Sequence, residues 1–502
     1  METRIEKLNE ENRKEIIEEA GKILQNGGLV AFPTETVYGL GANALDAEAA
    51  AKTYRAKGRP SDNPLIVHIA DWEDLKAIVK EIPLQAELAA RSFWPGPLTM
   101  IFQKSDLVPY GTTGGLDTVA VRMPSNETAL EVIRAAGGYV SGPSANTSGR
   151  PSPTNAGHVA EDLSGKIDMI LDDGDVEIGL ESTILDMTVV PPMILRPGAI
   201  TKEMAQEVLG EVDVDQTILS AESKEPPKAP GMKYRQYAPK ADLVIVEGTV
   251  ENEVKAIRQL VYGRVCCGEK AGVIATTETQ KQYTHGLVKV IGTRSSEKSV
   301  ARNLYAILRD FDREDVRIIY SESFAVQGLG RAIMNRLEKA AGHQKVDAEA
   351  IIKQQKYHKI IFVSESDVIR GPMAAEMLRN QKLDKEYDIL SRGLVVLFPE
   401  PVNQKVEVVM KSHGLLLDGY MSNVFSVEET EEDTLILTMD EAQKKSLERL
   451  EGLRGDLFTL EEFTRSEEEM PQPIGQPLDE YEKCYQKIAK EIETLTKILN
   501  EL

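Results

Sequence analysis

The chain has 502 residues, of which 41% are hydrophobic and 28% charged, which is typical of folded globular domains and excludes wholesale disorder. Its formal net charge of −22 repels polyanions, so tight non-specific binding to RNA or DNA is disfavoured and a phosphate site must be a local exception. Three cysteines cannot make a disulfide framework, and neither a signal peptide nor a membrane span is recognisable. We expect about three domains in a reducing, cytoplasmic compartment, with no membrane partner.

The first part of the chain, about residues 27–200, alternates short β-rich runs with helical periodicity. This alternation predicts an α/β domain built on a twisted sheet. Expected strands lie at residues 28–32, 64–69, 98–102, 118–123 and 169–173, with helices at 48–56 and 127–136.

Four prolines within residues 222–240 interrupt both periodicities and predict a linker. A second α/β pattern follows and predicts a small Rossmann-like domain. Its expected strands are 241–248, 271–276, 287–292 and 316–322, with helices near 251–262, near 298–310 and from residue 328. A third unit begins with a strand at 359–363, continues through a short loop into a helix at 371–380, and closes with a charged amphipathic helix near 478–500. The expected domains are 1–215, a proline-rich linker or lid 216–240, 241–346, and 356–502.

A basic run, Lys57-Gly58-Arg59-Pro60, and a polar run, Ser144 to Gly149, are candidate phosphate-binding elements of the first domain. We expect Lys57 and Arg59 to lie on the same side of an extended segment, where they could hold two phosphates. Small hydroxyl and amide side chains before a helix could form an anion cradle. The alternatives are a solvated basic surface and an ordinary capped turn.

Two arginines and one histidine stand near the ends of apolar strands. Arg122 and Arg196 need a carboxylate or phosphate partner if they are buried, and internal ion pairs would satisfy them equally well. His68 near the end of its strand is more often a satisfied core residue than a ligand.

Seven motifs in this region, in this order, resemble the YrdC-type domain of threonylcarbamoyl-AMP synthases over about 170 residues. They are PTETVYGLG (33–41), KGRPSDNPLIVHI (57–69), FWPGPLT (93–99), AVRMP (120–124), PSANTSGRPSPT (143–154), GLEST (179–183) and ILRPG (194–198). PGMKYRQYAP (230–239) and the following domain further resemble the long, two-domain form of that enzyme.

The resemblance implies a reaction in which L-threonine, bicarbonate and ATP give threonylcarbamoyl-AMP and pyrophosphate, with Mg²⁺ accompanying the triphosphate. The product would be handed to the proteins that transfer the threonylcarbamoyl group to tRNA. The same resemblance implies residue roles. Threonine would be held by Thr36, His68, Arg122, Gly142 and Ser182. ATP would be held by Lys57, Arg59, Asn63, Thr118, Ser144, Asn146, Ser152, Arg196 and Tyr234, with Lys57 and Arg59 as the catalytic cations and no metal ligand from the protein.

The chain departs from this family at two positions, because Asn126 and Gln236 stand where the family commonly has histidines. Both keep hydrogen-bonding ability but lose titration near neutral pH. We expect activity to be retained, with altered lid closure or pH response.

The third unit resembles the low-molecular-weight tyrosine and arginine phosphatases, a flavodoxin-like fold, over about residues 359–500. In that family a cysteine attacks phosphorus, an arginine six residues later grips the oxygens, and an aspartate before a proline protonates the leaving group. Here Ser364 and Gln472 replace the cysteine and aspartate, and Arg370 remains. A serine without a base and a glutamine cannot replace those groups, so we expect a pseudophosphatase.

Two carboxylates, Glu365 and Asp367, also lie in this degenerate loop and oppose a phosphate dianion. We expect Arg370 to be buried against Glu365 or Asp367. Two other functions stay open at this point, an RNA-binding YrdC-like module and a phosphatase with an ATP-sensing front end. The 241–346 domain shows no catalytic constellation, and its expected role is to anchor the linker so that Tyr234 can close the site.

Overall fold

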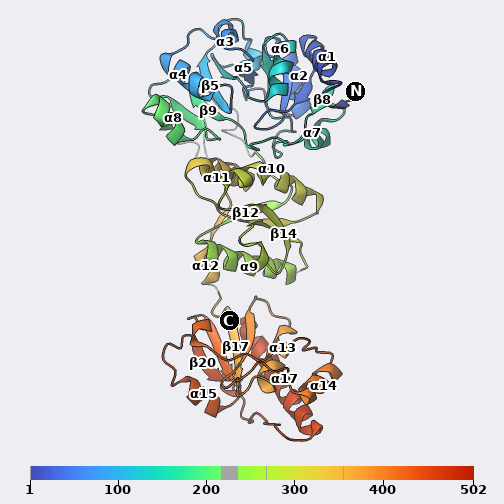
Figure 1. Cartoon of the computed structure of the whole chain (residues 1–502), viewed down its shortest axis with the longest axis vertical. Coiled ribbons are helices and arrows are strands. Elements are labelled where there is room, and N and C mark those ends of the chain that lie inside the picture. Colours follow the sequence, from blue (N-terminus) through green and yellow to red (C-terminus); the bar gives the residue numbers. More distant parts are fainter. Residues whose placement is uncertain (1, 216–235, 267, 354, 502) are drawn as a thin grey trace. The chain divides into compact units, whose positions relative to one another are not determined.

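The computed structural model describes residues 2–215, 236–266, 268–353 and 355–501 (Figure 1). They divide into two compact units, Met1–Ile257 with Glu269–Ala348, and Arg258–Gly268 with Glu349–Leu502. The first unit contains an eleven-stranded and a five-stranded sheet, and the second contains a four-stranded sheet. All three are α/β arrangements, as predicted. Within the described residues, no helix combines the length and the apolar character that crossing a membrane requires.

The eleven-stranded sheet mixes parallel and antiparallel pairs in the order β1-β8-β2-β3-β7-β4-β6-β5-β9-β10-β11. Each strand predicted for this region is present, and six further ones join them. The strands are β1 (Arg4–Lys7), β2 (Val30–Phe32), β3 (Gly39–Asn43), β4 (Ile66–His68), β5 (Leu98–Gln103), β6 (Thr118–Arg122), β7 (Val140–Ser141), β8 (Met169–Asp172), β9 (Thr183–Asp186), β10 (Met193–Arg196) and β11 (Asp213–Val214).

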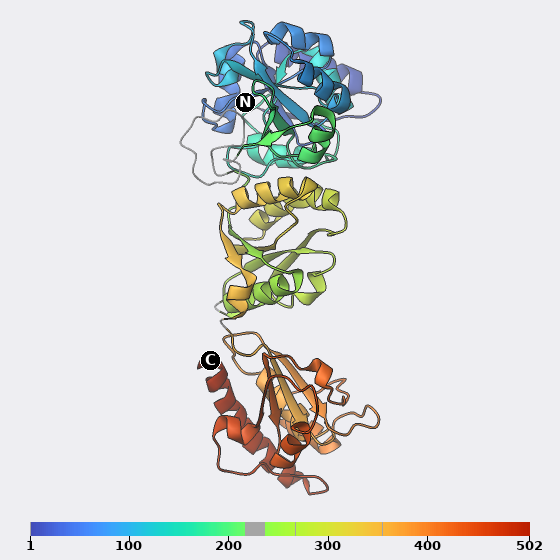
Figure 2. The ribbon, with the colours of Figure 1, turned by 90° about the vertical axis from the view of Figure 1, so that its left-hand side faces the viewer.

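Eight helices accompany this sheet among the described residues, and their apolar faces pack on it and on one another (Figure 2). The amphipathic periodicity of residues 127–136 is realised in a helix whose buried side chains recur every three or four residues. The helices are α1 (Arg13–Gln25), α2 (Ala47–Lys57), α3 (Trp72–Ile78), α4 (Leu84–Phe93), α5 (Tyr110–Thr113), α6 (Glu127–Ala135), α7 (Ala156–Leu163) and α8 (Lys202–Leu209).

Strand register places two of the predicted side chains next to each other. The parallel strands β4 and β6 pair His68 with Arg122, at the carboxyl end of both strands. Antiparallel β5 continues the sheet beyond β6, and β9 and β10 follow it. Arg196, the last residue of β10, pairs across the sheet with Ile184 of β9. The strand ends that carry the predicted polar residues therefore belong to one sheet.

The five-stranded sheet is parallel throughout, in the order β14-β13-β15-β12-β16. Helices α10 and α11 lie side by side on one of its faces (Figures 1 and 2). The predicted elements of this region are all present. They are β12 (Asp242–Glu247), α9 (Val250–Cys266), β13 (Ala271–Thr276), β14 (Leu287–Gly292), α10 (Glu297–Arg313), β15 (Ile318–Glu322), α11 (Gly328–Ala340), β16 (Lys345–Asp347) and α12 (Ala348–Ile352), with a short 3-10 helix at Gln280–Gln282.

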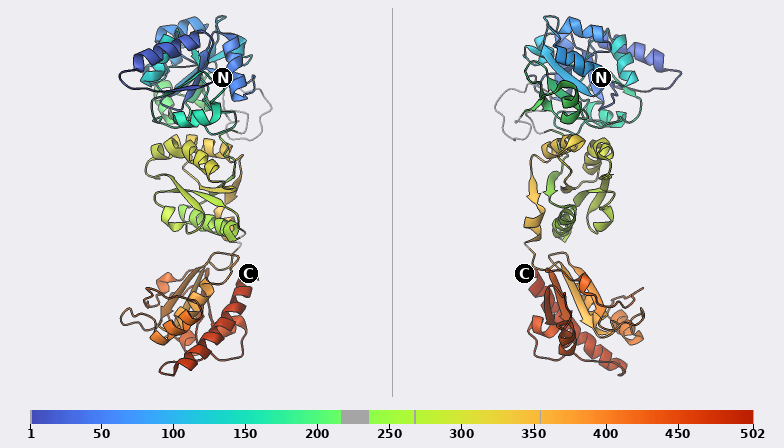
Figure 3. Two further views of the ribbon diagram at one scale, coloured as in Figure 1. Left: turned by 90° about the vertical axis from the view of Figure 1, so that its right-hand side faces the viewer. Right: turned by 60° about the vertical axis from the view of Figure 1, so that its left-hand side comes forward.

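The second unit has a parallel sheet in the order β18-β17-β19-β20. Figure 3 shows the long last helix running beside this sheet, and its apolar face is buried in the core. The predicted strand, loop and helix at 359–380 and the closing helix are confirmed. The elements are β17 (Lys359–Ser364), α13 (Arg370–Arg379), β18 (Asp388–Gly393), α14 (Gln404–Ser412), β19 (Thr434–Thr438), α15 (Glu441–Leu447), β20 (Asp456–Thr459), α16 (Leu460–Thr464) and α17 (Leu478–Glu501), with a 3-10 turn at Val427–Glu429.

Candidate active site

A pocket in the first unit collects most of the predicted polar residues. Among its described lining residues, one carboxylate faces five cationic side chains. The carboxylate is Glu181, and the cations are Lys57, Arg59, Arg122, Arg150 and Arg196. An acidic chain with a net charge of −22 therefore contains a local pocket with the opposite charge, as a bound polyphosphate requires.

Ten of the predicted site residues line this pocket. They are Thr36, Lys57, Arg59, His68, Arg122, Gly142, Ser144, Asn146, Ser182 and Arg196. Three others are outside its described lining. Asn63 is buried beside Arg59, Thr118 begins β6, and Ser152 is buried and donates a hydrogen bond of 2.5 Å to Glu181. The remaining residue, Tyr234, lies outside the described residues.

Lys57 is the last residue of helix α2, so the prediction that Lys57 and Arg59 share an extended segment is wrong. The physical reason is Gly58, which caps the helix at a φ of +61°, a left-handed conformation that glycine adopts without strain. The Lys57 ammonium is 1% exposed and donates to the backbone carbonyls of Ser144 and Asn146. Burial lowers its pKa well below the usual value, and Arg59 lowers it further.

Arg59 turns back onto the chain that follows it. Its Nε donates to the carbonyl of Asn63 at 3.1 Å, and its Nη2 donates to the carbonyl of Pro64 at 3.1 Å. Burial lowers the pKa of Arg59 to about 10, so the guanidinium still carries its charge at neutral pH. Both cations are therefore held by backbone carbonyls, which fix their positions without neutralising their charge.

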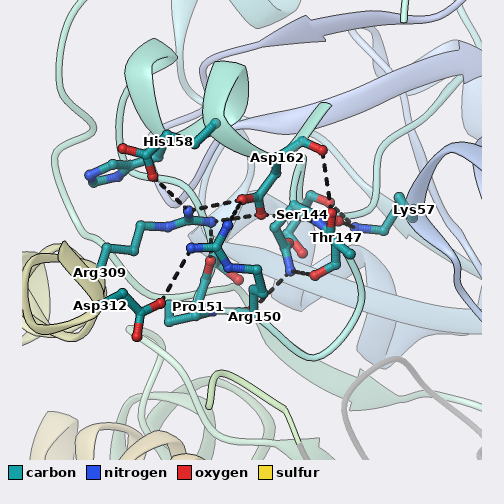
Figure 4. Close-up of polar contacts among 12 residues, drawn as sticks. Lys57, Ser144, Thr147, Arg150, Pro151, His158, Asp162, Arg309 and Asp312 are labelled. Atoms are coloured by element: carbon teal, nitrogen blue, oxygen red, sulfur yellow. Dashed lines mark hydrogen bonds and ion pairs between the residues drawn. The ribbon is translucent and has the colours of Figure 1, made fainter. Parts of the chain in front are cut away.

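The segment 144–152, which we call the pocket loop, follows β7 and forms one wall of the pocket. It is not itself at a helix amino end, because α7 begins at Ala156 and its cap is Asn155, which accepts from the backbone N–H of His158. The loop is instead held by side chains from elsewhere (Figure 4). The predicted anion-binding segment is therefore a loop that is held by the side chains of Lys57 and Asp162 and not by a helix amino end.

His68 is 2% exposed, and its Nδ1 lies 3.1 Å from the carbonyl oxygen of Ile66. Because a carbonyl only accepts, Nδ1 carries the proton and Nε2 is left as an acceptor. Burial, with the neighbouring Arg122, lowers the pKa of His68 to about 3, so the ring is neutral at physiological pH. A Cβ on Gly142 would come within 2.8 Å of this ring, which explains glycine at that position.

Arg122 forms a buried ion pair with Glu35, with Nη2 2.7 Å from Oε1 and both side chains 5% exposed. Its Nη1 donates to Thr36 Oγ1 at 2.9 Å. The sequence-based site contained Arg122 and Thr36 but not Glu35, although Glu35 lies in the motif PTETVYGLG. The sequence does contain a signal for Glu35, because this acid lies directly before Thr36, which is a predicted site residue.

Arg196 also lines the pocket. Its Nε donates to the carbonyl of Ser182 at 3.0 Å, and its Nη2 donates to Ser182 Oγ at 3.1 Å. The adjacent Glu181 accepts from Tyr305 of α10 at 2.8 Å and from Arg336 of α11 at 2.9 Å. Although burial alone would raise it, Arg336 and Arg196 hold the pKa of Glu181 below its ordinary value. Glu181 is therefore an ionised, fully engaged carboxylate.

The two positions that depart from the resembled family have different surroundings. Asn126 caps helix α6 by accepting from the backbone N–H of Ala129, and it is not part of the described pocket lining. Gln236 and the next residue, Tyr237, line the pocket. Tyr237 is 6% exposed, and its ring lies 5.1 Å from that of Tyr305. Of the two replacements, only Gln236 can touch a ligand in this pocket.

The loop of the second unit has a different character. Arg370 is the first residue of α13 and pairs with Asp440 at 2.7 Å while donating to the carbonyl of Met439. The prediction that Arg370 would pair with Glu365 or Asp367 is therefore wrong. The physical reason is that the buried Asp367 carboxylate is already occupied by the Ser391 hydroxyl and by the backbone N–H of Asn423.

A groove beside this loop is strongly acidic. Arg370 is the one cation among its described lining residues, which also include Gln472. Seven carboxylates line it, namely Glu365, Asp440, Glu441, Glu461, Glu467, Glu468 and Glu469. The Ser364 hydroxyl at the end of β17 is buried and has no hydrogen-bond partner among the residues that the structure describes. These groups oppose the binding of a phosphate dianion.

Three family models match the chain. The first, described as Telomere recombination, covers residues 22–198. The second, described as Threonylcarbamoyl-AMP synthase, C-terminal domain, covers residues 200–342. The third, described as Low molecular weight phosphotyrosine protein phosphatase, covers residues 359–502.

Two curated relatives are threonylcarbamoyl-AMP synthases. The protein of Pyrococcus abyssi is 48% identical over 338 residues, which are 66% of this chain and 97% of the relative. The protein of Bacillus subtilis is 48% identical over 327 residues, which are 65% of this chain and 93% of the relative. The chain belongs to the threonylcarbamoyl-AMP synthase family. A crystal structure of P. abyssi Sua5 complexed with L-threonine is 46% identical, with a TM-score of 0.65, and covers 69% of this synthase and 99% of that chain.

Proposed function

We infer that this chain is an L-threonylcarbamoyladenylate synthase, which converts L-threonine, bicarbonate and ATP into threonylcarbamoyl-AMP, pyrophosphate and water. The single observation that carries this function is a pocket with five cations and one carboxylate, formed by the residues of the family motifs. Membership of the synthase family over about two thirds of the chain supports the same reaction.

The chemistry needs no enzyme nucleophile. Bicarbonate takes up a proton and releases its hydroxyl as water, which leaves CO2. The threonine amine then adds to the carbon of CO2, which forms the carbamate N–C bond, and the proton that the nitrogen loses balances the one taken up. A carbamate oxygen then attacks the α-phosphorus, and the bond to the β-phosphate breaks with departure of pyrophosphate. The protein therefore contributes positioning and the neutralisation of developing negative charge.

We assign the binding of threonine to Thr36, His68, Arg122, Gly142 and Ser182, all of which line the pocket. Arg122 is the partner for the threonine carboxylate, and Glu35 behind it fixes the plane of the guanidinium. The neutral His68 offers an acceptor nitrogen to the threonine amine. With a pKa of about 3, His68 orients the amine and does not hold its proton at neutral pH.

The ATP side is the end that holds Lys57, Arg59 and Arg196 together with the pocket loop. Lys57 keeps one ammonium hydrogen beyond the two donated to the loop carbonyls, and it directs that hydrogen and its charge at the phosphates. Bringing a phosphate next to the buried Lys57 favours its charged form, which offsets the pKa depression caused by burial. Remaining proposed contacts with ATP come from Asn63, Thr118, Ser144, Asn146, Ser152 and Tyr234.

Mg²⁺ would accompany the triphosphate. The one carboxylate among the described lining residues, Glu181, already accepts from Ser152, Tyr305 and Arg336. This pocket thus offers no free carboxylate in the described lining, and phosphate oxygens and water would be the ligands of the ion. The bound ion would screen charge on the β- and γ-phosphates.

The decisive experiment measures ATP consumption by the purified full chain in bicarbonate buffer with and without L-threonine. The proposal requires threonine-dependent release of pyrophosphate together with an AMP-linked product that carries the threonine carbon skeleton. Serine and valine in place of threonine are matched controls. Threonine-independent hydrolysis of ATP to ADP would overturn the proposal.

The phosphatase-like domain, by contrast, is proposed to lack phosphoester hydrolysis. Ser364 stands at the nucleophile position, Gln472 at the acid position, and the guanidinium of Arg370 is engaged by Asp440. The carboxylates of the adjacent groove repel a phosphate dianion. We assign this domain a contact or regulatory role.

The proposed organisation is a catalytic domain at residues 1–215, a linker or lid at 216–240, an accessory domain at 241–346 and the phosphatase-like domain at 356–502. The proposed location is the cytoplasm. Its adenylate product would pass to the proteins that transfer the threonylcarbamoyl group to tRNA, and the acidic chain itself would not hold nucleic acid tightly.

A further inference from the structure

Arg309 is a fully buried arginine of helix α10, and its guanidinium reaches across to the eleven-stranded half of the first unit (Figure 4). It donates to Asp162 through Nη1 at 3.2 Å and through Nη2 at 3.0 Å. Nη2 also donates to the backbone carbonyl of Pro151 at 2.6 Å. One side chain from the accessory domain therefore touches both the pocket loop and the residue that supports it.

Asp162, near the end of α7, is the support of the pocket loop. One of its carboxylate oxygens accepts from the backbone N–H of Thr147 at 3.0 Å, and the other accepts from Arg150. Its backbone carbonyl accepts from the Thr147 hydroxyl at 3.3 Å. Asp162 is completely buried, so it holds the loop only if its charge is compensated.

The same loop also holds Lys57. Lys57 donates to the carbonyls of Ser144 and Asn146, and its own carbonyl accepts from the N–H of Ser148 at 2.8 Å. A continuous series of direct contacts thus leads from Arg309 through Asp162 and the loop to the catalytic ammonium. A shift of the loop would move the groups that hold the phosphates.

The charge balance gives Arg309 a second effect on the pocket. A buried, uncompensated carboxylate behind a phosphate site would repel the nucleotide. Arg150 also pairs with Asp162, but Arg150 is 30% exposed, lines the pocket and additionally reaches Asp312 at 3.3 Å. Arg309 is the fully buried partner of Asp162, and it also reaches Glu161 at 3.3 Å, a carboxylate that Arg313 pairs with as well. With Arg309 in place, compensation of the Asp162 charge does not depend on Arg150 alone.

A simple role as a staple between two packed regions explains this arrangement less well. Burying an ion pair costs desolvation energy, and apolar side chains of the same size stabilise such a contact as well or better. The apolar neighbours of Arg309 on α10, including Leu308 and Phe311, are already buried. An arginine at position 309 is explained by the buried carboxylate of Asp162, whose charge an apolar side chain could not compensate.

We propose that Arg309 is a positioning residue for the nucleotide, which acts through Asp162 on the pocket loop. The accessory domain then forms part of the ATP site and does more than anchor the linker. This inference deepens the proposed function, because the ligand whose binding it controls is ATP and not threonine.

The test measures two dissociation constants by titration calorimetry on the full chain, one for the methylene analogue of ATP that cannot be cleaved at the α-phosphorus and one for L-threonine. Arg309→Met is expected to weaken binding of the analogue about 10-fold, within the range known for residues that act through packed networks, with threonine affinity nearly unchanged. Arg302→Met, which removes the same charge from an exposed position on the same helix, is the matched control and is expected to change neither constant.

Asp162→Asn tests the route. If Arg309 acts through Asp162, the double variant Arg309→Met with Asp162→Asn binds the analogue no more weakly than the single variant with the lower affinity. Additive losses would overturn the route, and unchanged analogue affinity or an equal loss for threonine would overturn the positioning role. Should Arg309→Met fail to fold, Arg309→Lys keeps the charge without the two-pronged contact, and it must still weaken analogue binding selectively.

These binding measurements do not depend on turnover. A wild-type chain that binds the analogue but makes no adenylate would refute the proposed function and leave the role of Arg309 standing. A wild-type chain that makes adenylate, combined with normal analogue binding by Arg309→Met, would refute only the role of Arg309.

Discussion

Two loops of this chain, the pocket loop after β7 and the loop after β17, each follow a strand but lie in surroundings of opposite charge. In the synthase pocket, five cations face one engaged carboxylate. The described lining of the groove in the phosphatase-like domain contains seven carboxylates and one arginine, which is paired with Asp440. A loop that follows a strand is therefore not enough to bind phosphate, because the sign of the surrounding charge decides what can enter.

The two sites also differ in how their cations are held. Lys57 and Arg59 donate to backbone carbonyls, which orient the cations and leave their charge uncompensated. Arg370 is bound to a carboxylate, which neutralises it. Lys57 and Arg59 can therefore meet a polyanion without giving up an ion-pair partner, whereas Arg370 would have to leave Asp440.

The largest expected effect comes from removing the two catalytic cations. Lys57→Ala with Arg59→Ala should lower the rate of threonine-dependent pyrophosphate release by about 10³-fold or more, since a single preorganised donor to a developing negative charge is worth about 10²–10³. Arg302→Ala, an exposed arginine of the same chain, is the control. Adenylate formation by the double variant at the wild-type rate would show that these two cations do not stabilise the bound phosphates.

A second prediction concerns the pH dependence of stability. The folded-state pKa of His68 is about 3, below its ordinary value of 6.5, so the unfolded chain binds more protons between these limits. His68 therefore destabilises the folded state as the pH falls from about 6.5 towards 3, and it has no such effect above that window. Asp367 in the other loop has a raised pKa because of burial, so its contribution changes with pH in the opposite direction.

Thermal unfolding of the wild type and of His68→Gln at pH 7 and pH 5 tests this sign. The loss of melting temperature between the two pH values should be smaller in the variant, which lacks the titrating ring. His158, whose pKa is lowered to about 4, is present in both proteins and contributes equally. An identical pH dependence in both would show that His68 is not desolvated as the structure has it.

The elements of the fold could be predicted from the sequence because apolar periodicity is local. The run that ends in His68 and the run that ends in Arg122 are both strands, and α10 lies where its pattern places it. Motif residues also came together in one pocket, since the carboxyl ends of β4 and β6 are adjacent.

The failures have physical causes that sequence spacing does not carry. The run Lys57 to Pro60 predicts an extended segment, whereas Lys57 is the last residue of α2 and Gly58 ends that helix. Asp440 is 70 residues from its partner Arg370, and Arg309 is 147 residues from Asp162, so neither pair could be inferred without the fold. Such partners depend on packing between distant elements.

A smaller effect is expected from Gln236, which lines the pocket where the family commonly has histidine. Gln236→His restores a titratable ring near the nucleotide side and should raise the rate of pyrophosphate release a few-fold, most clearly at slightly acidic pH where the ring is charged. Asn126→His is the matched control, because Asn126 caps α6 and is outside the described lining. An unchanged rate for Gln236→His over pH 6–8 would contradict the prediction.

The smallest effect is expected from restoring the nucleophile of the phosphatase-like loop. Ser364→Cys should leave hydrolysis of an aryl phosphate at background, because Arg370 is engaged by Asp440, the carboxylates of the adjacent groove repel the dianion, and the general acid is still missing. Adding Gln472→Asp supplies the missing acid, but it also brings one more negative charge into the groove. Hydrolysis that appeared with Ser364→Cys alone would show that charge is not the barrier. The same variant combined with Glu365→Gln and Asp440→Asn, which frees Arg370, is the one in which activity should first become measurable.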